Sequence, residues 1–175
     1  MSEPTLEDRF HLIGIGGAGM SVVAELLASR GATVEGSDRE DSAVLEHLRS
    51  VGVRVFVGHE GSHVDPDSVV VVSTAIREDN PELAIARTRG QLVIHRSQAL
   101  ALAATGMRFV GVAGAHGKTS TSGMLAIALA ACGLDPSVAV GGVLPQLGTG
   151  AHLGGGDVFV AEADESDGSF LNYSP

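Results

Sequence analysis

The chain alternates between short apolar runs and longer segments whose apolar residues recur at helical spacing. Short runs that are apolar throughout are typical of strands buried on both faces of a parallel sheet, and the intervening spacing predicts amphipathic helices. The fold class is therefore α/β, with a doubly wound parallel sheet. The predicted strands of the first part are Arg9–Ile15, Ala32–Gly36, Val53–Val57, Ser68–Val72 and Leu92–Ile94. The predicted helices are Ser21–Arg30, Ser42–Val51, Asn80–Arg89 and Ser97–Ala104.

The pattern starts again after Gly106, and we place a domain boundary there, so the predicted domains are 1–105 and 106–175. The second part is predicted to hold one long helix, Ser120–Ala131, and a glycine-rich loop from Gly141 to Gly156. Its predicted strands are Phe109–Ala113, Ser137–Val140 and Asp157–Ala161. Because one helix cannot cover both faces of a parallel sheet, part of this sheet should be exposed. The side chains expected to be exposed are Phe109, Val110, Val158 and Phe159.

A glycine motif follows the first predicted strand. Gly14, Gly16 and Gly19 fit the spacing G-x-G-x-x-G between a strand and a helix, which cradles a diphosphate at a helix N-terminus. Asp38 lies just past the second strand, where a carboxylate contacts a ribose or base in a Rossmann unit. The motif indicates a nucleotide without identifying it. A glycine turn that serves only strand–helix packing is the alternative.

Three more polar residues follow predicted strands of the first part. His59 closes the third strand, and Ser73 and Thr74 end the valine-rich fourth strand. The carboxyl ends of parallel strands border the crevice where α/β sheets bind ligands, which makes these residues candidates for substrate contact. Helix capping, or a surface position for the histidine, is the alternative.

A second glycine loop follows the strand that starts the second part. Strand, glycine loop, lysine, hydroxyl and helix follow one another as in a phosphate-binding loop, whose backbone amides surround phosphate oxygens. Lys118 is the chain's one lysine, and the other ten cations are arginine. Val112 stands where the usual pattern has glycine, and an ordinary strand-to-helix turn is the alternative. The predicted phosphate contacts are Gly114, Ala115, His116, Gly117, Lys118, Thr119 and Ser120.

An acidic cluster ends the last predicted strand. Glu162 follows an apolar run directly, and Asp164, Glu165 and Asp167 come next. A carboxylate at the end of a strand beside a phosphate loop suits Mg²⁺, which prefers oxygen ligands. Glu162 and the Thr119 hydroxyl are therefore the candidate metal ligands. A solvated acidic turn is the alternative.

The composition and net charge of the chain limit the kinds of partner that it is expected to bind. The 175 residues carry a formal net charge of −10, which argues against nucleic-acid or anionic-membrane binding. Cys132 is the single cysteine, so no disulfide framework is expected. The acidic start lacks the features of a secretory leader, and no apolar run approaches membrane-spanning length. These features predict a cytoplasmic location.

Together these stretches resemble the Mur ligase family. The resemblance rests on five motifs, in the family's order and spacing, and covers nearly the whole chain from Arg9 onward. One departure is Ala115, where threonine is usual; this removes a hydroxyl but leaves the backbone donors. The five motifs are GIGGAGM at residues 14–20, GSD at 36–38, STAIREDNPE at 73–82, GAHGKTST at 114–121 and EADESD at 162–167.

The resemblance implies an ATP-dependent amide ligase of peptidoglycan precursor synthesis. It would join L-alanine to UDP-N-acetylmuramate through an acyl phosphate, with ATP and Mg²⁺ as cofactors. Lys118 and Glu162 would be the catalytic residues, and Thr119 and Glu162 would each hold a Mg²⁺ ion. The chain would end within the ATP-binding domain, without the amino-acid-binding domain, and would be inactive in ligation alone. The UDP-substrate contacts would be Gly16, Gly17, Ala18, Gly19, Asp38, His59, Ser73 and Thr74.

Other functions remain open at this stage. A nicotinamide-dependent dehydrogenase accounts for the first glycine motif and Asp38, but not for Lys118 with Glu162. A non-catalytic nucleotide-binding module fits a chain that holds only part of an active site. The related ligase that recycles murein tripeptide shares the motifs, with a less similar first glycine loop. The sequence also leaves a homodimer open.

Overall fold

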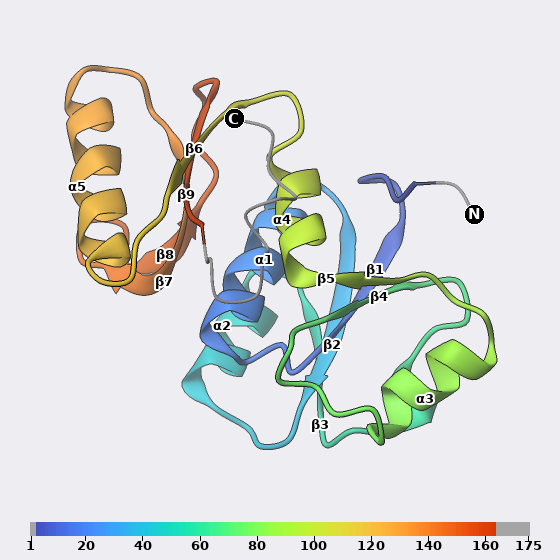
Figure 1. The fold of residues 1–175 in the computed structure, drawn as a ribbon. Helices are drawn as coiled ribbons and strands as arrows, with labels where there is room; N and C mark the ends of the chain where they lie inside the picture. Colours follow the sequence, from blue (N-terminus) through green and yellow to red (C-terminus); the bar gives the residue numbers. More distant parts are fainter. Residues whose placement is uncertain (1–2, 164–175) are drawn as a thin grey trace.

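The computed structural model describes residues 3–163, which form two sheets (Figure 1). The first sheet has the strand order β3-β2-β1-β4-β5, and every neighbouring pair is parallel. This order belongs to a doubly wound nucleotide-binding sheet, which confirms the predicted fold class. The strands are β1 (Arg9–Ile13), β2 (Thr33–Asp38), β3 (Arg54–Val57), β4 (Val69–Val72) and β5 (Val93–His95).

Helices cover both faces of the first sheet (Figure 1). One face packs on α1 (Ala18–Ser29), α2 (Ala43–Ser50) and α4 (Arg96–Ala103). The opposite face packs on α3 (Pro81–Thr88), beside the short 3₁₀ helix η1 (Gly61–His63). Because side chains alternate along each strand, Phe10 and Leu12 face the first layer and Ile13 faces the second. None of the helices in residues 3–163 is long and apolar enough to cross a bilayer.

The second sheet has the order β6-β9-β7-β8, in which only the β7–β8 pair is antiparallel. Its strands are β6 (Arg108–Val112), β7 (Ser137–Leu144), β8 (Thr149–His152) and β9 (Val158–Glu162). The helix α5 (Lys118–Ala131) packs on one face. The prediction of a loop over residues 141–156 is therefore wrong, because β7 continues to Leu144 and β8 pairs with it.

The second face of this sheet packs on the first part of the chain. Helix α1 contacts β7 and β8, and Phe159 and Ala161 of β9 join the core built on Phe10 and Leu12. The expectation of exposure is wrong for Val158 and Phe159, which are 5% and 0% exposed, and holds for Val110 at 37%. Phe109 is partly buried against the same core. The domain boundary at residue 106 stays a prediction, since one hydrophobic core spans both sheets.

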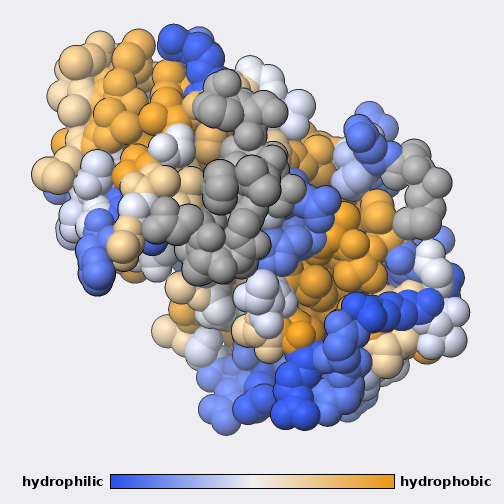
Figure 2. Space-filling model, viewed as in Figure 1, coloured by the Kyte–Doolittle hydropathy of each residue, from blue (hydrophilic) through white to orange (hydrophobic). Residues whose placement is uncertain are grey.

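Apolar side chains remain on the outer side of α5, where Figure 2 shows an orange region over that helix. Met124 is 65% exposed and Ile127 40% exposed. Helix α5 therefore presents apolar residues both to the sheet and to solvent.

Candidate functional site

The first glycine loop is tied to the end of β2. Gly14 adopts a φ of +75°, and the N–H groups of Gly14 and Ile15 both donate to the Ser37 carbonyl, at 2.8 and 2.9 Å. Helix α1 then begins at Ala18, and its N-cap residue Gly17 supplies no side-chain cap. The first amides of α1 are therefore available to an anion, which the helix dipole also favours.

Asp38 braces this loop. Its Oδ2 accepts a hydrogen bond of 2.8 Å from the Gly16 N–H, and its Oδ1 accepts one of 2.7 Å from the backbone N–H of Arg39. A Cβ at Gly16 would lie 2.9 Å from that Oδ2, so the close approach of loop and carboxylate requires glycine. The predicted contact between Asp38 and a ribose or base stays a prediction. The structure shows the carboxylate holding the loop at the carboxyl end of β2.

The other predicted substrate residues lie at the same edge of the sheet. Ser73 and Thr74 directly follow β4, and Ile76 of that turn lies against Gly14, where an added Cβ would be 3.2 Å from the Ile76 Cδ1. His59 follows β3, and its Nδ1 lies 2.8 Å from the Ser37 hydroxyl. The carboxyl ends of β1, β2, β3 and β4 thus bring the predicted substrate residues to one border, where doubly wound sheets bind ligands.

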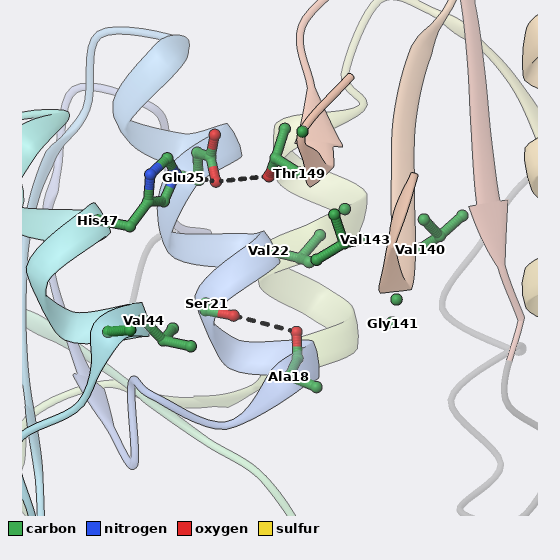
Figure 3. A pocket seen from close by; sticks show the side chains of 14 residues that line it. Ala18, Ser21, Val22, Glu25, Val44, His47, Val140, Gly141, Val143 and Thr149 are labelled. Carbon is green, nitrogen blue, oxygen red and sulfur yellow. Dashed lines mark hydrogen bonds and ion pairs between the residues drawn. The ribbon is translucent and has the colours of Figure 1, made fainter. Parts of the chain in front are cut away.

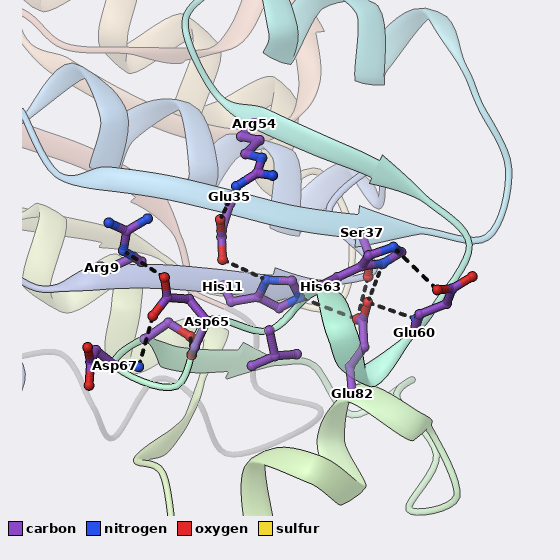
Figure 4. Close-up of polar contacts among 12 residues, drawn as sticks. Arg9, His11, Glu35, Ser37, Arg54, Glu60, His63, Asp65, Asp67 and Glu82 are labelled. Carbon is purple, nitrogen blue, oxygen red and sulfur yellow. Dashed lines mark hydrogen bonds and ion pairs between the residues drawn. The ribbon is translucent and has the colours of Figure 1, made fainter.

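A buried polar network lies beneath this edge, on the α3 side of the sheet (Figure 4). His11 is fully buried, with its Nδ1 3.4 Å from Glu35 and its Nε2 3.4 Å from Glu82. Burial opposes the charge on His11, but the hydrogen bonds to these carboxylates raise its pKa overall. Burial likewise opposes the charge on Glu82, but hydrogen bonds from His11 and Ser37 lower its pKa. The two carboxylates therefore favour the protonated form of the buried His11 ring.

The second glycine loop begins α5. Gly114 and Gly117 have φ values of +141° and +81°, a region that favours glycine, and Gly117 is the N-cap of α5. The Lys118 ammonium donates to the Gly114 carbonyl at 2.7 Å, so it lies folded over the loop. The side chains of Ala115, His116, Thr119 and Ser120 are exposed around it. This geometry presents a lysine, a hydroxyl and backbone amides together, as the sequence predicts.

Glu162 lies beside this loop. It pairs in register with Val112, the last residue of the loop strand β6, and its Oε1 accepts from the Gly141 N–H at 3.2 Å. Thr119 and Glu162 are oxygen donors, which fit Mg²⁺, although residues 3–163 hold no group of three potential metal-ligating side chains. The predicted acids at 164–167 lie outside the described residues.

The two loops meet at a small cavity of about 80 Å³. Gly19 of the first loop and Lys118 of the second both line it, together with Glu162. Arg96 lines it as well, and a Cβ at Gly19 would lie 2.7 Å from the Arg96 Nη1, so the guanidinium lies over the start of α1. Sequence reasoning missed Arg96, although it follows β5 directly and so stands at the carboxyl edge of the sheet.

A larger cavity of about 380 Å³ lies on the other side of α1 (Figure 3). It is bordered by α1, α2 and the β7–β8 pair. Glu25 of α1 joins the walls, because its carboxylate lies 3.2 Å from the His47 Nε2 and accepts from the Thr149 hydroxyl at 3.1 Å. At the wall of this cavity, Glu25 of α1 therefore connects α2, which covers the first sheet, with β8 of the second sheet.

Known proteins are similar to this chain in sequence. The family model described as "Mur ligase family, catalytic domain" matches residues 9–108. The UDP-N-acetylmuramate–L-alanine ligase of Renibacterium salmoninarum is 55% identical over 167 residues, which are 95% of this chain and 36% of that protein. The corresponding ligase of Streptomyces avermitilis is 56% identical over 173 residues, or 98% of this chain and 37% of that protein. The chain thus spans little more than a third of these relatives.

Solved structures of two ligases share the fold of this chain. The UDP-N-acetylmuramate–alanine ligase of Thermotoga maritima superposes with a TM-score of 0.86 at 33% identity, over 95% of this chain and 39% of that one. The UDP-N-acetylmuramate:L-alanyl-γ-D-glutamyl-meso-diaminopimelate ligase of Neisseria meningitides reaches 0.84 at 29% identity, over 91% of this chain and 53% of that one. The arrangement of the two sheets is therefore shared with both kinds of ligase.

Proposed function

We propose that this chain, which belongs to the Mur ligase family, is the UDP-sugar-binding and phosphate-loop part of an ATP-dependent ligase that joins L-alanine to UDP-N-acetylmuramate. One observation carries the proposal. Gly19 of a diphosphate-type loop and Lys118 of a second phosphate-type loop line the same cavity, which Arg96 and Glu162 line as well. A dehydrogenase needs the first loop only. Two phosphate loops at one cavity suit a reaction between a nucleotide sugar and ATP.

The chemistry requires activation of a carboxylate, which is a poor electrophile because it is anionic and resonance-stabilised. The γ-phosphoryl group of ATP passes to the carboxylate oxygen, ADP leaves, and an acyl phosphate forms. The alanine amine then attacks the carbonyl carbon, loses a proton and displaces phosphate. The protein positions the reactants and stabilises the charge that develops during transfer.

The residues of this chain divide that work. The amides that begin α1 and the Arg96 guanidinium hold the diphosphate of the UDP-sugar. Lys118 leaves the Gly114 carbonyl to bind the outer phosphates of ATP, whose oxygens also accept from the loop amides. Thr119 and Glu162 would hold Mg²⁺, which neutralises phosphate charge when it is bound. Asp38 and His59 border the nucleoside end of the UDP-sugar.

The ligand preference tests this proposal. Calorimetry should show that the chain binds UDP-N-acetylmuramate and has no measurable affinity for NADH. Lys118→Ala should weaken ATP binding roughly tenfold or more, because an ammonium–phosphate contact is lost, and leave UDP-sugar binding unchanged. Arg9→Ala, which removes a partly exposed cation at the amino end of β1, the edge of the sheet opposite the first glycine loop, serves as the control and should change neither affinity. Tight binding of NADH without binding of the UDP-sugar would contradict the proposal.

The murein tripeptide ligase is the second candidate, since such enzymes share the fold at TM-scores of 0.84. Sequence identity favours alanine as the amino acid, because among solved structures the alanine ligase of Thermotoga maritima is 33% identical to this chain, against 29% and 27% for the peptide ligases. A non-catalytic nucleotide-binding module is the third candidate.

We place the protein in the cytoplasm, where ATP is available. Sedimentation of the purified chain tests the homodimer.

A further inference from the structure

The hydroxyl of Ser37 connects two functional side chains at the carboxyl edge of the first sheet. Its Oγ lies 2.5 Å from the Oε2 of Glu82 and 2.8 Å from the Nδ1 of His59. Ser37 is fully buried at the end of β2, and its carbonyl accepts the N–H groups of the first glycine loop. The same residue therefore holds the loop through its backbone and His59 through its side chain.

The number of protons fixes the direction of these hydrogen bonds. Burial opposes the charge on Glu82, but the hydrogen bond from His11 and the charge of His11 help to lower its pKa, so the carboxylate is ionised and can only accept hydrogen bonds. The single hydroxyl proton of Ser37 is therefore donated to Glu82. The Ser37 oxygen must then accept from His59, so the proton of a neutral His59 ring resides on Nδ1 and Nε2 carries a lone pair.

Glu82 is held firmly enough to impose this arrangement (Figure 4). It is 0% exposed, although it belongs to the first turn of α3, where a glutamate is ordinarily solvated. Its carboxylate also accepts from the Glu60 N–H at 3.3 Å and lies 3.3 Å from the His63 Nδ1 and 3.4 Å from the His11 Nε2. With partners on β1, β2, η1 and the segment after β3, the carboxylate is fixed in position.

His59 is the member of this network that reaches the ligand edge. Its side chain is 20% exposed, whereas the side chains of Glu82 and His11 are fully buried. The neighbouring Gly58 N–H donates to the Asp38 carbonyl at 2.7 Å, which places His59 beside the end of β2 and the first glycine loop. Within residues 3–163, the hydrogen bonds of His59 are made through Nδ1, so Nε2 is available to a ligand.

We propose that Glu82 is a positioning residue that acts through Ser37 to present the His59 Nε2 as a hydrogen-bond acceptor, and that this acceptor selects a nucleobase with a ring N–H donor. Uracil carries such an N–H at N3. Cytosine carries a lone pair at the same position, so two acceptors would face each other. This inference rests on the proposed function, because it assumes that the base of a UDP-sugar lies at this edge.

The tautomer is measurable without any ligand. In the free chain labelled with ¹⁵N-histidine, at pH 8 and therefore above the ordinary titration range of histidine, NMR should show the His59 proton on Nδ1. Ser37→Ala should move the proton toward Nε2. Glu82→Gln should act in the same direction, because its amide can donate to the Ser37 oxygen and free the hydroxyl proton for the His59 Nδ1. A proton on Nε2 in the unmodified chain would overturn the proposal.

Base selectivity gives the second readout. The chain should bind UDP about tenfold or more tightly than CDP, the ratio expected when one hydrogen bond is replaced by two opposed acceptors. Ser37→Ala should bring the ratio of the two affinities close to one, and Ser37→Thr, which keeps the hydroxyl, should restore it. Ser68→Ala is the matched control, since Ser68 is 3% exposed and its hydroxyl donates to the Asp65 carbonyl at the opposite end of the sheet.

The outcomes separate this inference from the proposed function. Urea unfolding of each variant shows whether its fold is intact, and a structural role alone would change the unfolding midpoint without changing the UDP-to-CDP ratio. If UDP binds and Ser37→Ala keeps the original ratio, the positioning role of Glu82 is wrong and the proposed function stands. If neither nucleotide binds the unmodified chain, the proposed function and the base selection both fail. The NMR measurement of the His59 tautomer then tests by itself whether Glu82 acts on His59 through Ser37.

Discussion

At the scale of single residues, the pairing of His11 with Glu82 makes stability depend on pH. The folded-state pKa of His11 lies above its ordinary value of 6.5, so the stabilisation is complete below pH 6.5 and is lost as pH rises through the folded pKa. The pKa of Glu82 lies below its ordinary value of 4.5, so its stabilisation is present above pH 4.5 and is lost as pH falls through the folded pKa. Both contributions are present together between 4.5 and 6.5.

We therefore predict that the chain is more resistant to urea at pH 5.5 than at pH 8, through this pair. His11→Gln should destabilise the chain by about 3–5 kcal/mol at pH 5.5, because a buried carboxylate pair loses its cation. It should also remove most of the difference between the two pH values. His152→Gln, which changes a half-exposed histidine paired with Asp135, should keep that difference. An unchanged pH dependence in His11→Gln would show that other groups set it.

Single residues also show which features of the candidate site can be predicted from the sequence and which cannot. Gly14, Gly117 and Lys118 were identifiable because the requirements for positive φ and for a lysine after a glycine loop are local in the chain. Glu82 and Arg96 were not identified, since their positions depend on contacts with residues far away in sequence. A glutamate after Asn80-Pro81 has the pattern of an exposed helix start, and only the folded sheet places His11 and Ser37 around it.

At the scale of elements, the strands and helices of the first sheet follow the hydrophobic pattern within a few residues. The β7–β8 pair was missed because glycines were interpreted as loop residues. Gly150 instead permits close packing: an added Cβ would lie 2.4 Å from the Val140 carbonyl oxygen and 3.3 Å from Val22 of α1. Glycine here serves contact between a strand and a helix, which composition cannot distinguish from a flexible loop.

Helix α1 offers a test of the diphosphate site. Gly19→Ala should place a Cβ 2.7 Å from the Arg96 Nη1, and the arginine can move aside because its side chain is flexible. We predict roughly tenfold weaker UDP binding by calorimetry, since a charged contact is displaced. Stability should be unchanged or up to about 1 kcal/mol higher, because alanine favours the helix. Ser29→Ala, at the exposed far end of α1, is the control. Full affinity in Gly19→Ala would exclude Arg96 from the diphosphate site.

At the scale of the whole molecule, the two sheets share a hydrophobic core. Helix α1 is buried between them, with β2 on one side and β7 and β8 on the other. The bond from Thr149 to Glu25 and the packing of Phe159 into the core of Phe10 both cross the predicted boundary at residue 106. The sequence pattern showed two sheets but could not show this contact, because periodicity assigns each strand to a face without identifying the helix that covers it.

This shared core predicts that the chain unfolds as one cooperative unit. Phe159 is 0% exposed and its ring stacks on Phe109 at 5.8 Å, so Phe159→Ala should cost about 3–5 kcal/mol. Its effect should extend to the first sheet: hydrogen exchange should show the amides of β1 and β9 losing protection in the same transition, because side chains of both strands belong to one hydrophobic core. Val143→Ala, at a side chain 69% exposed, should change stability by no more than about 0.5 kcal/mol. If β9 exchanged while β1 stayed protected, the two sheets would be independent units, and the contact of α1 with β7 and β8 would contribute little to stability.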